Sequence, residues 1–333
     1  MHTVIETNDS SFQQHWKTLL NNDPVQDPLY KSFAQVDGGA ITNRLGYRDR
    51  SFLVVDENQP IFGCSLTLHV DSKGRKRLGY FGLDACTHVN RDSLKNTANN
   101  FSPDSIRLLQ QHIDYLLEQE QPQTIDYYDP VSCGIMSPVT QVLLQKGAQP
   151  TVQQVQLIDL TLPANELLGR MSSDCRSNIR WGSSRLEIDV VRAGRAQHRE
   201  ATPTLDHSTQ SARLKNYMEL LNRGQGFQVQ VRSNKTMIAS ALFVHSNRTC
   251  QYVYADVMHK RSACLTMEPL LQQIIWRGML EAKSEGCEHL DFAHQHADSL
   301  ANRLPAIAPA SFGSVVHTRL KVSLTGGDTR ITH

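Results

Sequence analysis

The stretch of sequence that decides the fold is residues 227–293, which read FQVQVRSNKTMIASALFVHSNRTCQYVYADVMHKRSACLTMEPLLQQIIWRGMLEAKSEGCEHLDFA. It predicts three short strands, a long helix and one further strand. Asn234 and Asn247 lie in the two tight connections, where a short polar side chain tolerates unusual backbone angles. The predicted elements are strands over 227–231, 237–245 and 249–257, a helix over 268–285 and a strand over 289–293.

The predicted helix has a wide apolar face. Leu271, Ile275 and Met279 recur at every fourth position, and further apolar residues lie beside them, so this face is expected to be buried. Gly286 ends the helix. A strand, a crossover helix and a second strand form a right-handed unit, in which active groups gather at the carboxyl ends of the strands. That rule points to residues 256–260 and 291–296.

Composition places the chain among ordinary globular proteins. Its 333 residues are enough for about two domains, and 39% of them are hydrophobic and 20% charged. No apolar run approaches the roughly 20 residues of a membrane helix, and the first residues do not resemble a secretory signal. The seven cysteines are scattered and form no CxxC pair, which suggests free thiols in a reducing compartment. We therefore expect a cytoplasmic protein without a membrane span.

Charge is unevenly distributed between the two halves. Residues 1–150 hold 13 Lys and Arg against 17 Asp and Glu, a net charge of −4, whereas residues 151–333 hold 21 against 16, a net charge of +5. The excess is concentrated in one arginine cluster: Arg170, Arg176, Arg180, Arg185, Arg192, Arg195 and Arg199. Two interpretations stay open, a site for phosphate groups and a solvated helix face.

The two halves predict the same order of elements. Each has a strand, helices, a run of antiparallel strands, a helix and a strand. Strands are expected over 3–6, 51–55, 61–70, 78–83 and 124–128, helices over 11–20 and 102–117, and a loop over 84–102. In the second half we expect a strand over 155–160, helices over 162–171 and 174–185, and strands over 188–192 and 314–322. The expected fold is α/β with a mixed sheet, in domains 1–150 and 151–333.

Three segments resemble a known family. LPANELLGRMSSDCRSNIRWGSSRLEIDVV (162–191) is similar to a helix-then-strand motif in which Arg176, Ile179 and Arg180 match. TMIASALFVHSNRTCQYVYADV (236–257) resembles an aliphatic hairpin that leads to a Tyr-rich strand. EPLLQQIIWRGMLEAKSEGCEHLDFAHQ (268–295) places Gly286, Asp291 and Phe292 in register with a third motif. Residues 155–296 thus resemble the GNAT acyltransferase fold, in the branch of FemAB peptidyltransferases and BioF-like (CelD-like) acetyltransferase domains.

The resemblance implies tandem GNAT-like domains, the second more recognisable than the first. It also implies an N-acyltransferase that moves an acyl or aminoacyl group from acyl-CoA or aminoacyl-tRNA to an amine. The acceptor would be a small molecule, or a sugar, peptide or cell-envelope precursor, and no cofactor would be tightly bound. Two departures stand out. Residues 259–266 contain no glycine where many acetyl-CoA enzymes have a Gly-rich loop. Residues 293–296 read AHQH where the family often has Gly and then Lys.

Candidate site residues follow from the strand ends. His294 or His296 would act as a base oriented by Asp291, with Asp256 and Tyr254 as second choices. The donor's phosphate would bind Arg176, Arg180, Lys260 and Arg261. The opposing interpretation is that Asp291 caps local backbone and the histidines are exposed. The sequence His294-x-His296 with Asp291 and Asp298 contains zinc or iron ligand types, but no third firm ligand is evident, and we expect no metal.

Two other functions stay open. One is a catalytically inactive GNAT-like protein that binds a partner or a nucleotide-linked ligand, which the missing glycines and lysine favour. The other is aminoacyl transfer in which the whole tRNA is recognised. That function predicts a basic surface over both halves, whereas the first half is acidic. No long heptad segment is present to form the helical arm that such enzymes often carry.

Overall fold

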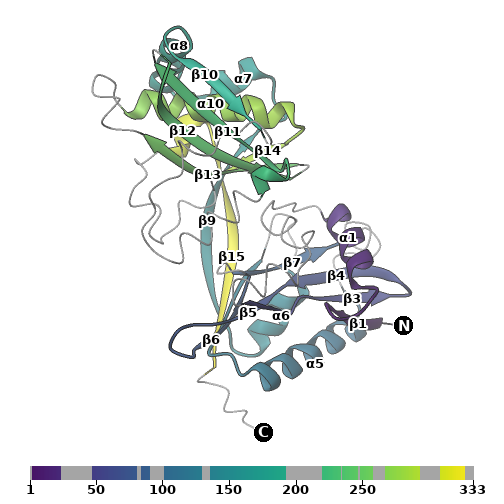
Figure 1. Ribbon diagram of the computed structural model, residues 1–333. Helices are drawn as coiled ribbons and strands as arrows, with labels where there is room; N and C mark the ends of the chain where they lie inside the picture. The colour runs from purple at the N-terminus through teal and green to yellow at the C-terminus, as the bar shows by residue number, and fades with distance from the viewer. Residues whose placement is uncertain are drawn as a thin grey trace. The chain divides into compact units, whose positions relative to one another are not determined.

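The computed structural model describes residues 2–23, 47–80, 84–90, 101–129, 136–192, 220–233, 235–246, 248–257, 267–292 and 308–326. The chain divides into two compact units, each with its own group of strands and helices (Figure 1). Unit 1 comprises residues 1–26, 33–154 and 318–333, and unit 2 comprises residues 27–32 and 155–317. This division differs from the expected domains at the C-terminus, because residues 320–325 pair with a strand of unit 1.

The described part of unit 1 combines strands with three helices, which lie on both faces of the strands. Its strands are β1 (His2–Glu6), β2 (Tyr47–Asp49), β3 (Phe52–Asp56), β4 (Gln59–Ser65), β5 (Thr67–Val70), β6 (Lys76–Gly79), β7 (Ala85–Val89), β8 (Thr124–Asp129) and part of β15 (Val315–Thr325). Its helices are α1 (Phe12–Asn22), α5 (Pro103–Glu120) and α6 (Pro138–Gln145). The strand order is β1-β3-β4-β7-β8-β15, with β5 and β6 joining through β8 and β2 pairing with β5.

Sequence signals set the helix starts of unit 1. Ser102 caps α5 by accepting a hydrogen bond from the backbone N–H of Ser105, and Pro103 occupies the first turn. Ser137 and Pro138 do the same for α6. Two expectations for this unit are wrong. The strand expected over 61–70 is divided between β4 and β5, which pair with different strands. The segment 84–102, expected to be a loop, contains the strand β7. This strand is short and includes polar residues, but it pairs with β4 and β8.

Unit 2 contains the stretch from which the fold was predicted. Its strands are β9 (Gln149–Asp159), which begins in unit 1, β10 (Glu187–Val191), β11 (Gly226–Ser233), β12 (Thr236–His245), β13 (Thr249–Val257) and β14 (His289–Asp291). Its helices are α7 (Ala164–Arg170), α8 (Ser173–Ser183), α10 (Met267–Ser284) and the 3-10 helix η4 (Pro309–Phe312). The strand order is β9-β14-β13-β12-β11-β10. The elements predicted over 227–293 are confirmed to within about two residues, whereas Asn234 and Asn247 lie outside the described residues.

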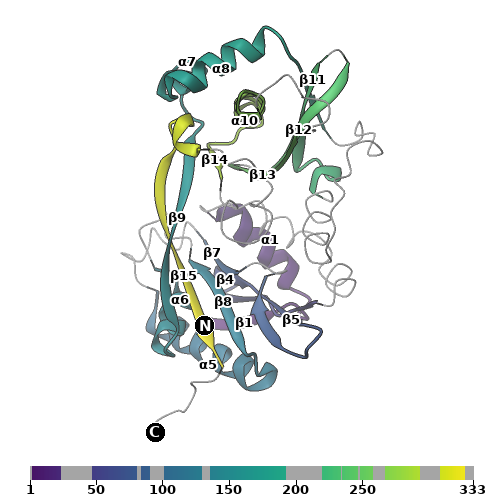
Figure 2. The ribbon, with the colours of Figure 1, turned by 90° about the vertical axis from the view of Figure 1, so that its left-hand side faces the viewer.

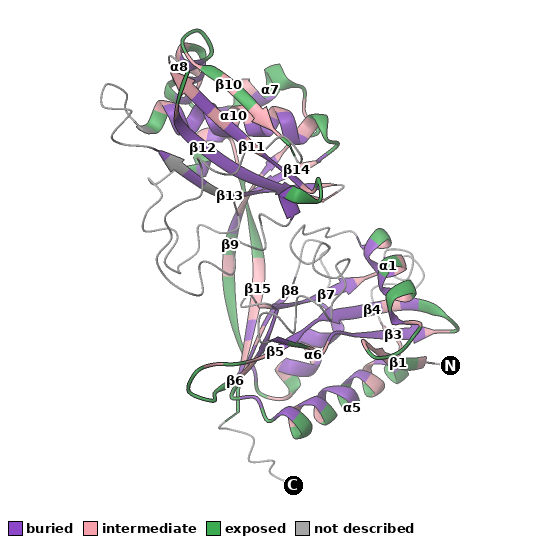
Figure 3. Ribbon diagram, in the orientation of Figure 1, coloured by how far each residue is buried: buried purple, intermediate pink, exposed green. Residues whose placement is uncertain are grey.

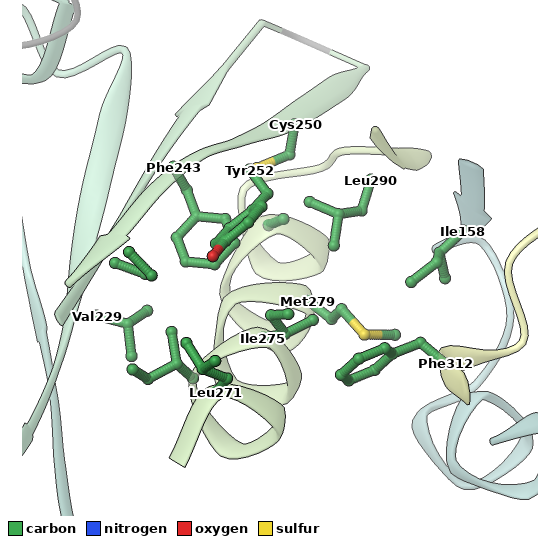
Figure 4. Packing of buried hydrophobic residues seen from close by; sticks show 14 of the residues in the cluster. Ile158, Val229, Phe243, Cys250, Tyr252, Leu271, Ile275, Met279, Leu290 and Phe312 are labelled. Carbon is green, nitrogen blue, oxygen red and sulfur yellow. The ribbon is translucent and has the colours of Figure 1, made fainter. Parts of the chain in front are cut away.

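Helix α10 organises the core of unit 2. Leu271, Ile275 and Met279 are buried, and Leu271 lies toward Val229 of the sheet while Met279 lies beside Phe312 (Figure 4). On its other side α10 packs against α8 (Figure 2). The helix ends at Gly286, whose φ of 84° is left-handed, and the backbone N–H of Cys287 donates to Ala282 O at 3.0 Å.

Both units contain a parallel strand pair joined by a helix. In unit 1 the pair is β7 and β8, joined by α5, and in unit 2 it is β13 and β14, joined by α10. In each unit the second strand of the pair is antiparallel to its other neighbour, β15 or β9. The order of elements that the two halves share in the sequence is therefore a shared topology. None of the helices within the described ranges combines the length and apolar character that a membrane crossing requires.

Candidate functional site

The site begins where β13 and β14 stop pairing. Their register joins Thr249 to His289, Cys250 to Leu290 and Gln251 to Asp291. Beyond Gln251, β13 continues to Val257, and among the described strands its only remaining neighbour is β12. The prediction that the strand ending in Asp291 lies beside the Tyr-rich strand is confirmed. The paired residues are 249–251, at the start of that strand.

A bulge changes the direction of β13 immediately after this point. Tyr252 pairs with Phe243 and Tyr254 pairs with Leu242, so Val253 is the extra residue. A bulge twists a strand and re-aims its side chains, and bulges often lie beside functional sites. The residues that follow Phe292, 293–307, are outside the described residues, so the site predicted over residues 291–296 stays a prediction.

Gln251 and Asp291 face away from α10. Their neighbours Cys250, Tyr252 and Leu290 belong to the core cluster beneath α10 (Figure 4). Because side chains alternate along a strand, Gln251 and Asp291 point to the opposite face of the sheet. They lie side by side on adjacent strands, which are about 4.8 Å apart in any sheet.

Both side chains are buried although both are polar. Asp291 is 0% exposed and Gln251 is 1% exposed, and the strands around them are mostly buried as well (Figure 3). Neither the amide nitrogen nor the amide oxygen of Gln251 has a hydrogen-bond partner among the described residues. A buried polar group without a partner costs about 1–3 kcal/mol, so such a group needs an explanation.

Other glutamines of unit 2 do find partners when they are buried. Gln272 donates to Glu268 Oε1 at 3.1 Å and accepts from Asn178 Nδ2 at 2.8 Å. Gln273 hydrogen-bonds to Ser183 Oγ at 2.9 Å. Gln251 differs from these glutamines in hydrogen bonding. The sequence analysis did not single it out, and a lone polar residue in the apolar run CQYV was the available signal.

Contacts to Gln156 of β9 hold the end of β14 on one side. The backbone N–H of Phe292 donates to Gln156 O at 3.2 Å, and Ser314 Oγ donates to Gln156 Oε1 at 2.8 Å. The nearby thiol of Cys250 faces the core, where burial raises its pKa well above the usual value. Cys250 is therefore a packing residue of this site and not a thiolate nucleophile.

The other predicted catalytic residues are only partly described. The backbones of Tyr254 and Asp256 belong to β13, beyond the bulge, and their side chains are outside the description. His294, His296 and Asp298 lie outside the described residues. Within the described ranges, no cluster of His, Cys, Asp or Glu has a metal-binding arrangement. The catalytic assignments of these residues stay predictions.

The predicted phosphate-binding arginines are in different settings. Arg180 is exposed near the end of α8. Arg176 is half-buried, and its Nη1 donates to Met171 O at 2.5 Å and Gly169 O at 3.2 Å, so it stabilises the end of α7. Lys260 and Arg261 lie outside the described residues.

The rest of the arginine cluster is partly neutralised or stacked. Arg192 forms ion pairs with Glu281 of α10 and with Glu285, the residue that follows α10. Arg170 pairs with Glu166 at 3.2 Å, and Arg185 lies over the Trp181 ring at 5.6 Å. Arg195 and Arg199 are outside the described residues. Arg180 is thus the predicted phosphate ligand whose exposed position in the described structure fits that role best.

The corresponding strand ends of unit 1 are bridged by their own side chains. Tyr127 donates to Thr87 Oγ1 at 2.5 Å and hydrogen-bonds to Ser137 Oγ at 2.6 Å. Asp129 Oδ2 accepts from the backbone N–H of Ser137 at 2.9 Å and from Thr140 Oγ1 at 2.5 Å. Burial raises the pKa of Asp129. Because this network links β7, β8 and α6, we assign it first to holding unit 1 together.

Unit 1 also contains a buried Ser–His–Asp chain that the sequence analysis missed. Ser65 Oγ lies 2.7 Å from His88 Nε2, and His88 Nδ1 lies 2.8 Å from Asp23 Oδ2. These distances suit a nucleophile, a base and an orienting acid. However, all three residues are at most 1% exposed, and the ring of Trp16 in α1 packs edge-on against His88. The Trp16 ring covers the imidazole of His88, so we assign the chain to packing under α1.

Comparisons with known proteins give matches among solved structures only. No family model matches the sequence, and no curated protein matches it. The chain is similar to FemX, with 12% identity, a TM-score of 0.62 and coverage of 95% of this chain and 96% of FemX. It is similar to a tandem GNAT protein from the clavulanic acid biosynthesis pathway, with 10% identity, a TM-score of 0.54 and coverage of 98% and 99%. A third match is the C-terminal domain of a putative lysylphosphatidylglycerol synthetase from Agrobacterium fabrum, with 9% identity, a TM-score of 0.50 and coverage of 93% and 90%.

Proposed function

Because the chain has a FemAB-type fold of two GNAT-like units, we propose that it is an N-acyltransferase whose active site lies in unit 2. The donor carries an acyl or aminoacyl group on a phosphate-bearing carrier, acyl-CoA or aminoacyl-tRNA. The acceptor is an amine of a small molecule, or of a sugar, peptide or cell-envelope precursor. The observation that carries the proposal is the buried Asp291, beside Gln251, at the point where β13 and β14 stop pairing.

The proposed reaction needs few groups from the protein. The amine nitrogen bonds to the acyl carbon, and the carbonyl electrons move to oxygen. When the carbonyl re-forms, the bond to the thiol of CoA or the ribose oxygen of tRNA breaks. The base takes one proton from the nitrogen, and the leaving group receives one proton. We assign the base to His294 or His296, with Asp291 as the group that orients it, and Tyr254 and Asp256 as neighbours of the substrate.

The donor's phosphates would bind near the arginines and lysine identified from the sequence. Arg180 is exposed on α8, and α8 packs against α10. Lys260 and Arg261 precede the first residue of α10 in the sequence, and the N-terminus of a helix favours an anion. The tandem GNAT structure that this chain resembles is described with reference to AcCoA, so acetyl-CoA is the first donor to test.

Ligand-dependent stability tests this proposal before any substrate is known. Purified protein is heated with acyl-CoAs, aminoacyl-tRNA and UDP-sugars, and its unfolding temperature is compared with that of the free protein. A true donor at 100 times its Kd is expected to stabilise the chain by about 2.7 kcal/mol, because it binds the folded state only. Free CoA and deacylated tRNA serve as controls for the carrier. If none of the three ligand classes raises the unfolding temperature, the inactive binding protein becomes the better description.

A further inference from the structure

Gln251 has a hydrogen-bonding capacity that the described residues leave unused. Its amide offers two N–H donors and a carbonyl acceptor, and its 1% exposure keeps bulk water from bonding to them. Among the described residues neither polar atom of this side chain has a partner. A buried leucine of similar size would avoid that cost. The glutamine is therefore a candidate for binding something other than its own chain.

The position of Gln251 limits the kinds of ligand that it can bind. It is the last residue of β13 that is paired on both sides, with Val244 on one strand and Asp291 on the other. It shares the face of the sheet opposite α10 with Asp291, and the bulge at Val253 follows two residues later. A ligand at this point would contact a neutral amide and a carboxyl group on adjacent strands.

We propose that Gln251 binds the reacting groups of acyl transfer, an inference that rests on the proposed function. Its Nε2 donates to the carbonyl oxygen of the acyl group, and its Oε1 accepts an N–H of the attacking amine. The carbonyl oxygen gains negative charge when the C–N bond forms. The hydrogen bond that it accepts from the Gln251 N–H therefore becomes stronger. Glutamine side chains serve as such oxyanion donors, and loss of one donor typically lowers kcat by about 100- to 1,000-fold.

This role requires the substrate to carry particular chemical groups at the site. The ligand presents a carbonyl oxygen and an N–H within reach of one planar amide, as an acyl group and a primary amine do in the encounter before bond formation. An ionised phosphodiester or a carboxylate offers acceptors only and would leave Oε1 of Gln251 unbonded. The donor's phosphates are therefore expected to bind elsewhere in unit 2.

Three substitutions test the inference against a structural role. Gln251→Leu removes both polar atoms at similar volume, and Gln251→Met removes them on an unbranched side chain. Gln273→Leu is the matched control, because Gln273 is equally buried, at 2% exposure, but is hydrogen-bonded. Acyl transfer is measured with acetyl-CoA or aminoacyl-tRNA, whichever stabilises the wild-type protein, together with the unfolding temperature of each variant.

The expected results separate the roles. Both Gln251 variants should lose about 100-fold or more in kcat, while Gln251→Leu unfolds at the wild-type temperature or above it. Gln273→Leu should unfold at a lower temperature and keep its kcat. A Gln251→Leu variant that keeps the wild-type kcat in an active protein overturns this inference alone, as does one that unfolds as early as Gln273→Leu. A wild-type protein that responds to neither donor overturns the proposed function and this inference together.

Discussion

Replacing Asp291 by Asn is expected to lower kcat/KM for acyl transfer by about 100-fold or more. The substitution is nearly isosteric at a fully buried position. It removes the negative charge that, in the proposed mechanism, orients and stabilises the protonated base. The size of the loss follows from the role of an orienting carboxylate in a base–acid pair, where an Asp-to-Asn change leaves the geometry intact but disfavours the active tautomer.

A control on the neighbouring strand β9 distinguishes chemistry from folding. Asp159 is on β9 and pairs in register with His289, two residues before Asp291. Its carboxylate accepts hydrogen bonds from Thr161 near the surface, so Asp159→Asn should leave kcat/KM within about twofold. If Asp291→Asn has the kcat/KM of Asp159→Asn, and circular dichroism shows both folded, Asp291 is a structural residue.

Replacing Gly278 by Ala is expected to lower the free energy of unfolding of unit 2 by about 1–3 kcal/mol. A Cβ at this position of α10 would lie 2.3 Å from Cζ of Phe243, well inside van der Waals contact. The Phe243 ring is fully buried and stacks on Phe227, with ring centroids 5.2 Å apart, so it has no free space into which to move. The higher helix propensity of alanine offsets about 1 kcal/mol at most.

Gly169 provides the matched control for this change. It lies in α7, and an added Cβ would meet nothing within 4 Å, so Gly169→Ala should stabilise the chain by up to about 1 kcal/mol. Urea unfolding of both variants measures the difference. Adding Phe243→Leu to Gly278→Ala makes room for the new methyl group, so the two losses should be less than additive. Equal stability of the two Gly→Ala variants would contradict the packing of α10 on β12.

Local patterns predicted the elements of unit 2 well, because its signals are strong over short range. The apolar positions of α10 repeat at the helical period, and Gly286 has the left-handed φ that a helix end requires. The tandem GNAT-like fold expected from the resemblance is confirmed by the solved structures that the chain matches. In contrast, β7 was missed because Thr87 and His88 are polar. It is a strand because β4 and β8 pair with it on its two sides. The five residues of β7 alone carry no signal of that pairing.

The sequence predicted where the site lies better than it predicted which side chains lie next to one another there. The rule of strand ends led to Asp291, but the partner of each side chain depends on register. Gln251 and Asp291 are neighbours because a parallel pairing aligns residues 40 positions apart, and Arg192 finds Glu281 89 positions away. Neither relation leaves a periodic signal in the sequence. Burial of the face opposite α10 is also a tertiary property, which is why the glutamine in an apolar strand was not recognised.

Hydrogen–deuterium exchange with and without a bound donor tests the central claim most directly. The donor is the acyl-CoA or aminoacyl-tRNA that raises the unfolding temperature. The account predicts slower exchange in peptides that cover residues 251–257 and 289–292 of unit 2, and unchanged exchange in residues 85–90 and 124–129 of unit 1. Slower exchange at the unit 1 strand ends alone, with residues 251–257 and 289–292 unaffected, would contradict it.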